Sequence, residues 1–141
     1  MRAVDTNVLV RAIVNDDTAQ SARAVALLSE QDIFIPVTVV LELEWVLRSR
    51  YAFAPKVVAQ AIAKITALGN VVVGERAAVL FAASRAAQGW DFADALHVAL
   101  SEGCENFTTL DADLAKRAAR SVVVTDKDTK TLRSTPVVIK L

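Results

Sequence analysis

The sequence contains few of the residues from which several common kinds of site are built. A single cysteine, Cys104, excludes an internal disulfide, and one histidine, His97, leaves no material for a thiolate or multi-imidazole zinc site. The lone cysteine also agrees with a reducing compartment. A metal held by this chain must therefore be a hard ion with oxygen ligands, and Mg²⁺, with Mn²⁺ as a substitute, is the expected cofactor.

Net charge and long apolar runs are also absent. Sixteen basic and sixteen acidic residues cancel, so the chain lacks the positive field of a non-specific nucleic-acid binder, and any phosphate recognition must be local. No apolar stretch approaches the roughly 20 residues that a membrane span needs, and the N-terminus lacks the charged and apolar regions of a secretory signal. We therefore expect a soluble, cytoplasmic protein with no membrane partner.

The 141 residues are 54% hydrophobic and show no repeat, linker or low-complexity segment. A single domain over residues 1–141 is therefore expected, long enough to bury roughly two thirds of the surface of its unfolded chain. The excess of Ala and Val suits a two-sided α/β core or an apolar partner surface.

Short apolar runs alternate with segments of helical periodicity along the chain. Strands are expected over residues 3–4, 33–35, 71–73 and 106–109, and helices over residues 7–14, 18–28, 38–50, 55–68, 76–87, 91–103 and 112–119. Thr38 is the expected N-cap of the third helix. Two Val-rich segments, residues 122–124 and 137–139, are alternatives for a last strand, with a polar loop over residues 125–135 between them.

This alternation predicts a three-layer α/β/α domain with a mainly parallel central sheet. The all-apolar residues 71–73 are typical of a strand that is covered on both faces. In such sheets ligands collect at the carboxyl ends of the strands. Asp5 and Asp111 each follow an expected strand and are therefore expected at that edge.

Four carboxylates stand where an apolar run meets a polar turn or interrupt an apolar helix: Asp5, Glu42, Asp94 and Asp111. Two carboxylates roughly 5 Å apart at an effective dielectric of about 20 repel by about 3 kcal/mol. Three or four such acids would not stay ionised together without a cation. If the fold gathers them, the chain is a divalent-metal enzyme.

Each aspartate also has a structural alternative. Asp5 and Asp111 are placed to cap the helices that follow them, and Asp91 with Asp94 fits a variant of the capping box. Asp94 is hard to explain by capping alone, because it interrupts the apolar residues 92–96.

Glu42 is the most informative acid, because its helical neighbours Trp45 and Val46 place its carboxylate beside an apolar face. Buried acids are rare without a partner. The alternatives are an ion pair with Arg48 or another arginine, or an exposed side chain if the helix has a different phase. Glu44 points elsewhere on the helix and is expected to be solvated.

Several other side chains have both a functional and a structural interpretation. His97 follows Asp94 by three residues and is either its hydrogen-bond partner or a core residue, and Trp45 and Trp90 either stack on a base or belong to a core or interface. The basic residues that either reach phosphates or are simply solvated are Arg11, Arg48, Arg50, Arg85, Lys116 and Arg117.

The order and context of the acids resemble the PIN-domain nucleases, and especially the small VapC-type toxins of bacterial toxin–antitoxin pairs. The resemblance runs over most of the chain. It is carried by Val4-Asp5-Thr6-Asn7-Val8-Leu9, by residues 36–38 leading into 42–47, by residues 91–97, and by residues 109–113. The segment over residues 121–136 is longer and more polar than expected at the C-terminal end of a member of this family, so the position of the last strand stays open.

The resemblance implies an acidic metal and catalytic site made of Asp5, Glu42, Asp94 and Asp111. It implies Asp91 and Asp113 as auxiliaries, and Asn7 or Thr6 as the residue that holds the first acid. It further implies endoribonuclease activity on structured RNA such as transfer RNA, a homodimer, and a cognate antitoxin that covers residues 38–68 and places a basic side chain near the acids.

Metal-activated water would leave a 5′-phosphate and a 3′-hydroxyl, with Glu42 as a ligand or as the group that orients or deprotonates the water. One alternative is a Mg²⁺-dependent phosphatase or phosphotransfer domain, but such phosphatases usually carry Asp-x-Asp where this chain has Asp5-Thr6-Asn7. The other is an interaction protein that has kept the fold without activity.

Overall fold

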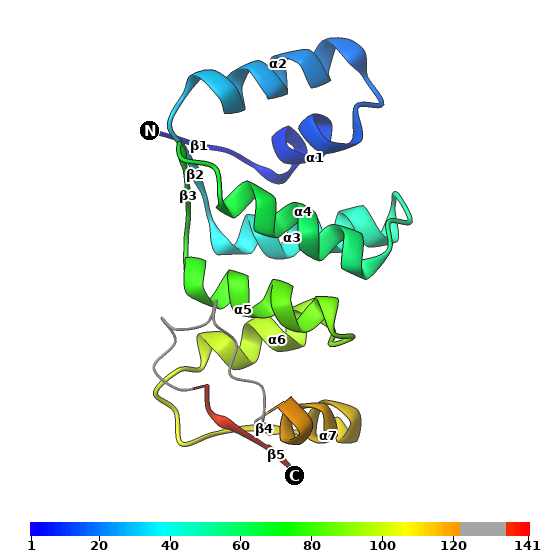
Figure 1. Cartoon of the computed structure of the whole chain (residues 1–141), viewed down its shortest axis with the longest axis vertical. Coiled ribbons are helices and arrows are strands. Elements are labelled where there is room, and N and C mark those ends of the chain that lie inside the picture. Colours follow the sequence, from blue (N-terminus) through cyan, green and yellow to red (C-terminus); the bar gives the residue numbers. More distant parts are fainter. Residues whose placement is uncertain (122–134) are drawn as a thin grey trace. The chain divides into compact units, whose positions relative to one another are not determined.

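The computed structural model describes residues 1–121 and 135–141, which form two compact units. Unit 1 comprises Met1–Arg76 and unit 2 comprises Ala77–Leu141 (Figure 1).

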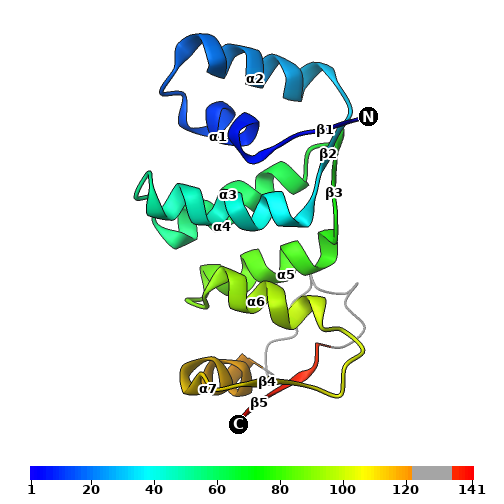
Figure 2. The ribbon, with the colours of Figure 1, turned by 180° about the vertical axis from the view of Figure 1, so that it is seen from behind.

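Unit 1 is built on a three-stranded parallel sheet of order β1-β2-β3. Its strands are β1 (Arg2–Ala3), β2 (Ile33–Ile35) and β3 (Val71–Val73), and its helices are α1 (Thr6–Val14), α2 (Thr18–Glu30), α3 (Val37–Ser49) and α4 (Pro55–Thr66). A pair of helices connects each strand to the next (Figures 1 and 2). This is the crossover that parallel strands require.

The helix starts in unit 1 follow from local chemistry. The carboxylates of Asp5 and Asp17 accept hydrogen bonds from the backbone N–H groups of Val8 and Gln20, and so cap α1 and α2. Pro55 occupies the first position of α4, where its missing N–H costs nothing. The predicted cap at Thr38 is wrong, because α3 already begins at Val37 and Pro36 holds the cap position.

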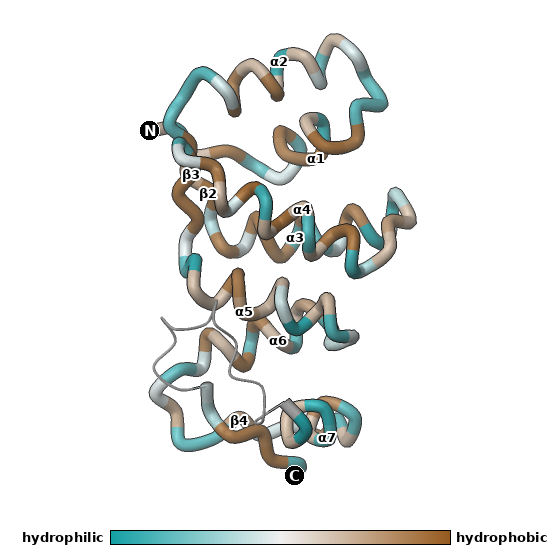
Figure 3. Tube along the Cα trace, in the orientation of Figure 1, coloured by the Kyte–Doolittle hydropathy of each residue, from teal (hydrophilic) through white to brown (hydrophobic). Residues whose placement is uncertain are grey.

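The core of unit 1 lies where the helices pack on β2 and β3, which Figure 3 colours as hydrophobic. Its largest fully buried side chains are Leu9, Ile33, Ile35, Leu43, Leu47, Val58 and Ile62. The residues of β3 alternate, since Val71 and Val73 are buried whereas Val72 is 47% exposed. The expectation that this strand is covered on both faces is therefore wrong at Val72.

Unit 2 contains α5 (Arg76–Ala87), whose first residue belongs to unit 1, followed by α6 (Phe92–Leu100), β4 (Asn106–Thr109), α7 (Ala112–Ser121) and β5 (Val137–Lys140). The two strands are parallel, with Asn106 opposite Val137 and Thr109 opposite Lys140. Of the two alternatives for the last strand, residues 137–139 are therefore in a strand. The other, residues 122–124, lies outside the described residues, as does nearly all of the predicted loop.

The turn between α5 and α6 packs Trp90 into unit 2. Gly89 has a φ of +100°, a conformation that glycine adopts without steric cost, and its carbonyl accepts a 2.6 Å hydrogen bond from Arg117 of α7. Trp90 is buried with its ring edge-on to Phe81, at 6.4 Å between centroids. The core interpretation of Trp90 is therefore confirmed.

The described strands pair only in parallel and alternate with helices, so the predicted α/β class with a parallel sheet is confirmed. Among residues 1–121 and 135–141, no helix is long and apolar enough to cross a membrane.

Candidate active site

The four acids singled out by the sequence lie in pairs, one in each unit. Asp5 and Glu42 belong to unit 1, and Asp94 and Asp111 belong to unit 2. Asp5 and Asp111 are each separated by one residue from the end of a strand, β1 and β4, and lie immediately before a helix, as predicted, whereas Glu42 and Asp94 lie within α3 and α6.

Asp5 is exposed at the carboxyl end of β1 and caps α1. Its Oδ1 accepts a 3.2 Å hydrogen bond from the N–H of Val8. The cap uses one of the two oxygens of the carboxylate, which together offer about four lone-pair positions. Capping and metal binding are therefore compatible at Asp5, and the cap fixes the direction of the side chain.

Glu42 is tied to the start of α1 by a hydrogen bond. The hydroxyl of Thr6 donates to Glu42 Oε2 at 2.9 Å, and Thr6 is only 6% exposed. Because Thr6 follows Asp5 in the chain, this bond holds the Glu42 carboxylate beside the helix start that Asp5 caps. The resemblance implied that Asn7 or Thr6 holds the first acid, but the hydrogen bond that Thr6 makes goes to Glu42.

The burial of the two glutamates on α3 is the reverse of the prediction. Glu42 is exposed, whereas Glu44 is only 4% exposed and accepts two hydrogen bonds from the guanidinium of Arg48, one of them from Nη2 at 3.2 Å. The expectation of a solvated Glu44 is wrong, and so is that of a Glu42 beside the apolar face. Trp45, on the same helix, is 52% exposed.

In unit 2, Asp94 lies half-buried near two other acids. Burial raises the pKa of its carboxyl group, and the negative charges of Asp91 and Asp111 raise it further, while nearby His97 lowers it. Asp91 is the N-cap of α6 and accepts a 3.0 Å hydrogen bond from the N–H of Asp94. His97 is exposed, so its interpretation as a core residue is wrong.

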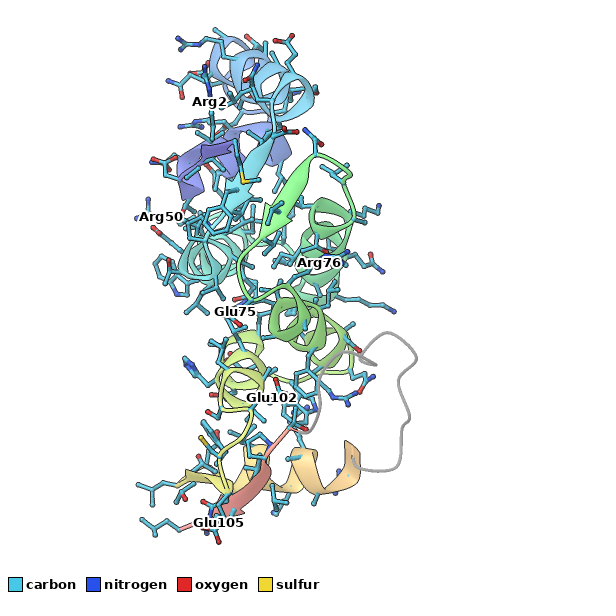
Figure 4. All side chains as sticks on the ribbon, turned by 90° about the vertical axis from the view of Figure 1, so that its left-hand side faces the viewer. Arg2, Arg50, Glu75, Arg76, Glu102 and Glu105 are labelled. Atoms are coloured by element: carbon cyan, nitrogen blue, oxygen red, sulfur yellow. The ribbon has the colours of Figure 1, made fainter. Side chains whose placement is uncertain are left out.

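Asp111 is exposed between β4 and α7 and acts as a cap. Its Oδ1 accepts hydrogen bonds from the N–H groups of Asp113 at 2.8 Å and Leu114 at 3.1 Å. Its own N–H donates to the Thr109 hydroxyl at 3.0 Å. Asp113 is exposed in the first turn of α7. Glu105, labelled in Figure 4, lies before β4 and is also exposed.

The chemistry of these donors fits a hard divalent cation. All four are carboxylates, and the influence of Asp91 and Asp111 on the pKa of Asp94 shows negative charge concentrated in unit 2. A divalent cation would relieve that repulsion, and oxygen donors suit Mg²⁺ or Mn²⁺. Within neither unit do the described residues gather three or more His, Cys, Asp or Glu side chains as a metal site.

A cavity of about 410 Å³ opens beside Asp5 in unit 1. It is lined by Asp5, Asn7, Val8, Arg11, Gln20, Arg23, Ala24 and Leu27. The sequence had pointed to Arg11 and Asn7, but not to Gln20 or Arg23. The signal for these two was available, because they lie three residues apart on α2 and so share a face of that helix.

Several of the basic residues that were candidates for phosphate contacts have structural partners. Arg11 pairs with Asp16, and the hydrogen bond between them lowers the pKa of the Asp16 carboxyl group. The guanidinium of Arg85 lies 4.8 Å from the centroid of the Phe81 ring and is buried. Arg50 is exposed.

Comparison with protein families gives one match. The family model described as PIN domain matches residues 2–120, which include all four acids. Neither the search of curated proteins nor the search of solved structures found a significant match.

Proposed function

Because the chain belongs to the PIN-domain family, whose members are in general nucleases that need divalent metal ions, we propose that it is a metal-dependent endoribonuclease. We propose further that it is the toxin of a toxin–antitoxin pair. The observation that carries the proposal is the match over residues 2–120 together with the acids at strand ends and helix starts within it.

We assign the carboxylates of Asp5, Asp94 and Asp111 as metal ligands, and Glu42 as a ligand or as the group that orients or deprotonates the attacking water. Mg²⁺, when bound, would lower the pKa of that water and stabilise the charge that grows on the scissile phosphate. The hydrogen bond from Thr6 supports the role of Glu42, because it fixes one carboxylate oxygen and leaves the other to act. Asp91 and Asp113 are proposed auxiliaries.

Capping also serves the proposed chemistry. Asp5 and Asp111 each accept backbone N–H through Oδ1 at the start of a helix, which fixes the direction of the side chain. A carboxylate has a second oxygen with which it can bind a cation.

The proposed substrate is structured RNA such as transfer RNA, and the proposed partners are a second copy of the chain and an antitoxin that covers residues 38–68. The exposed apolar side chains on α3 and α4 support a protein partner there. Trp45 is 52% exposed on α3, and Val57 is 50% exposed on α4. Apolar residues exposed on neighbouring helices are typical of an interaction surface.

The toxin role is tested by expressing the chain in bacteria beside the Asp94→Asn variant, with Glu105→Gln as a control that removes one exposed acid from the same unit. The proposal predicts growth arrest with the wild type and Glu105→Gln, and none with Asp94→Asn at equal levels of folded protein. Equal arrest by Asp94→Asn would instead favour the inactive interaction protein.

A further inference from the structure

The cavity in unit 1 has the size and chemistry of a nucleotide site. α1 and α2 pack against each other, as Figures 1 and 2 show, and residues of both helices line the cavity. Pockets that bind small molecules have volumes from roughly 300 Å³ upward, so a cavity of about 410 Å³ has room for one nucleotide but not for a duplex.

The residues of α2 that line the cavity form one helical stripe. Gln20, Arg23, Ala24 and Leu27 follow the spacing of three and four residues that places side chains on one face. Gln20 and Arg23 are exposed, whereas Ala24 is buried and Leu27 half-buried. The stripe therefore combines polar ends with an apolar floor.

Residues of α1 add to both the apolar floor and the polar ends of the cavity. Val8 extends the apolar floor, and Asn7 and Arg11 are four residues apart on the same side of the helix. The ion pair with Asp16 uses Nη1 of Arg11. Because a guanidinium carries five N–H donors, this ion pair orients the Arg11 side chain and leaves other N–H groups to bind a ligand.

We propose that this cavity binds one unpaired nucleotide of the RNA next to the phosphate that is cleaved. The inference rests on the proposed ribonuclease function. The guanidinium groups of Arg11 and Arg23 bind the phosphate of this nucleotide, and its base lies on the floor of Val8, Ala24 and Leu27. Asp5, a proposed metal ligand, is one of the residues that line the cavity.

The charge of the lining favours this occupant over an apolar one. Two guanidinium groups and two amides surround a floor of three aliphatic side chains, and the carboxylate among the lining residues is that of Asp5, a proposed metal ligand. Arg binds phosphate bidentately, which positions a nucleotide as well as attracting it.

The test is the equilibrium binding of a fluorescent single-stranded oligoribonucleotide of mixed sequence, measured by anisotropy in EDTA at several salt concentrations. Replacing Arg23 by Gln should weaken binding roughly fivefold and lower the slope of log K against log salt by about 0.7, the value for one lost phosphate contact on a single strand. Arg23→Lys should keep the slope. Lys64→Gln, which removes an exposed charge from α4, should bind within twofold of the wild type.

Cleavage of structured RNA such as transfer RNA with Mg²⁺ or Mn²⁺ separates this inference from the proposed function. In Arg23→Gln we expect KM to rise about fivefold with kcat little changed, as when binding common to substrate and transition state is lost. If the wild type cleaves RNA but Arg23→Gln matches Lys64→Gln in affinity, slope and KM, the nucleotide site is refuted and the nuclease stands. Binding that depends on Arg23, without cleavage under either metal, would refute the nuclease and leave the cavity as an RNA-binding site alone.

Discussion

The hydroxyl of Thr6 donates a 2.9 Å hydrogen bond to Glu42, a residue 36 positions further along the chain. It joins the first helical residue after Asp5 to α3, and so makes the position of one proposed catalytic acid depend on the start of the helix that another caps. Thr6 is buried, so the bond is shielded on the threonine side.

Thr6→Val should therefore impair cleavage more than it impairs folding. Valine has nearly the same shape but no hydroxyl, so Glu42 loses its orientation. We expect a fall in kcat of roughly tenfold, which corresponds to about 1.4 kcal/mol, and a loss of stability of about 1 kcal/mol. Thr6→Ser keeps the hydroxyl and serves as the control in the same kinetic assay. An unchanged kcat in Thr6→Val would show that Glu42 needs no such positioning.

Substitution of the two glutamates of α3 should show that Glu42 has a catalytic role and Glu44 a structural one. Glu42→Gln should abolish cleavage and leave the urea unfolding curve nearly unchanged, because the side chain is exposed. Glu44→Gln should lower the free energy of unfolding by about 2 kcal/mol, since it removes the negative charge that Arg48 binds inside the protein. The opposite pattern, with Glu42→Gln unstable and Glu44→Gln inactive but stable, would reverse the assignment.

Two substitutions of Asp111 should distinguish its cap from its proposed metal role. Asparagine still accepts the N–H groups of Asp113 and Leu114, so Asp111→Asn should keep near-native stability while losing cleavage. Asp111→Ala should lose cleavage and also about 1 kcal/mol of stability. Thermal unfolding and RNA cleavage, measured on both variants, test this. Full activity in Asp111→Asn would reduce the residue to a cap.

The raised pKa of Asp94 predicts that ionisation of this carboxyl group lowers the stability of the folded protein when no metal is bound. A folded-state pKa above the unfolded value means that Asp94 contributes most to stability at pH below its unfolded pKa, and that this contribution is lost as pH rises through the folded pKa. At neutral pH in EDTA, Asp94→Asn should therefore be slightly more stable than the wild type, by less than about 1 kcal/mol because the group is half-exposed.

Acidification to pH 3 should remove this difference between Asp94→Asn and the wild type. Added Mg²⁺ should raise the unfolding temperature of the wild type more than that of Asp94→Asn, because a ligand of the folded state stabilises it in proportion to its affinity. An equal Mg²⁺ response in both proteins would remove Asp94 from the set of ligands.

Much of unit 1 could be predicted from sequence because local signals agree there. The strand over residues 33–35 and the cap at Asp5 rest on an apolar run and on a carboxylate at a helix start. These features depend on neighbouring residues alone, so periodicity and capping preferences suffice to find them.

The features that sequence reasoning missed depend on contacts that periodicity does not record. Both glutamates of α3 have apolar neighbours, so the phase of the helix was ambiguous; the Arg48 pair and the Thr6 hydroxyl decide which one is buried. The cavity lining likewise needs α1 and α2 to pack together before Arg23 comes near Asp5.

The most direct test of the proposed function is the incubation of purified protein with a mixed RNA pool in Mg²⁺, in Mn²⁺ and in EDTA, beside folded Asp94→Asn, with analysis of the product ends. The account predicts cuts that need metal, vanish in Asp94→Asn, and leave a 5′-phosphate and a 3′-hydroxyl. Cuts that persist in EDTA, or that leave a 2′,3′-cyclic phosphate, would contradict it, because the RNA's own 2′-hydroxyl would then be the nucleophile.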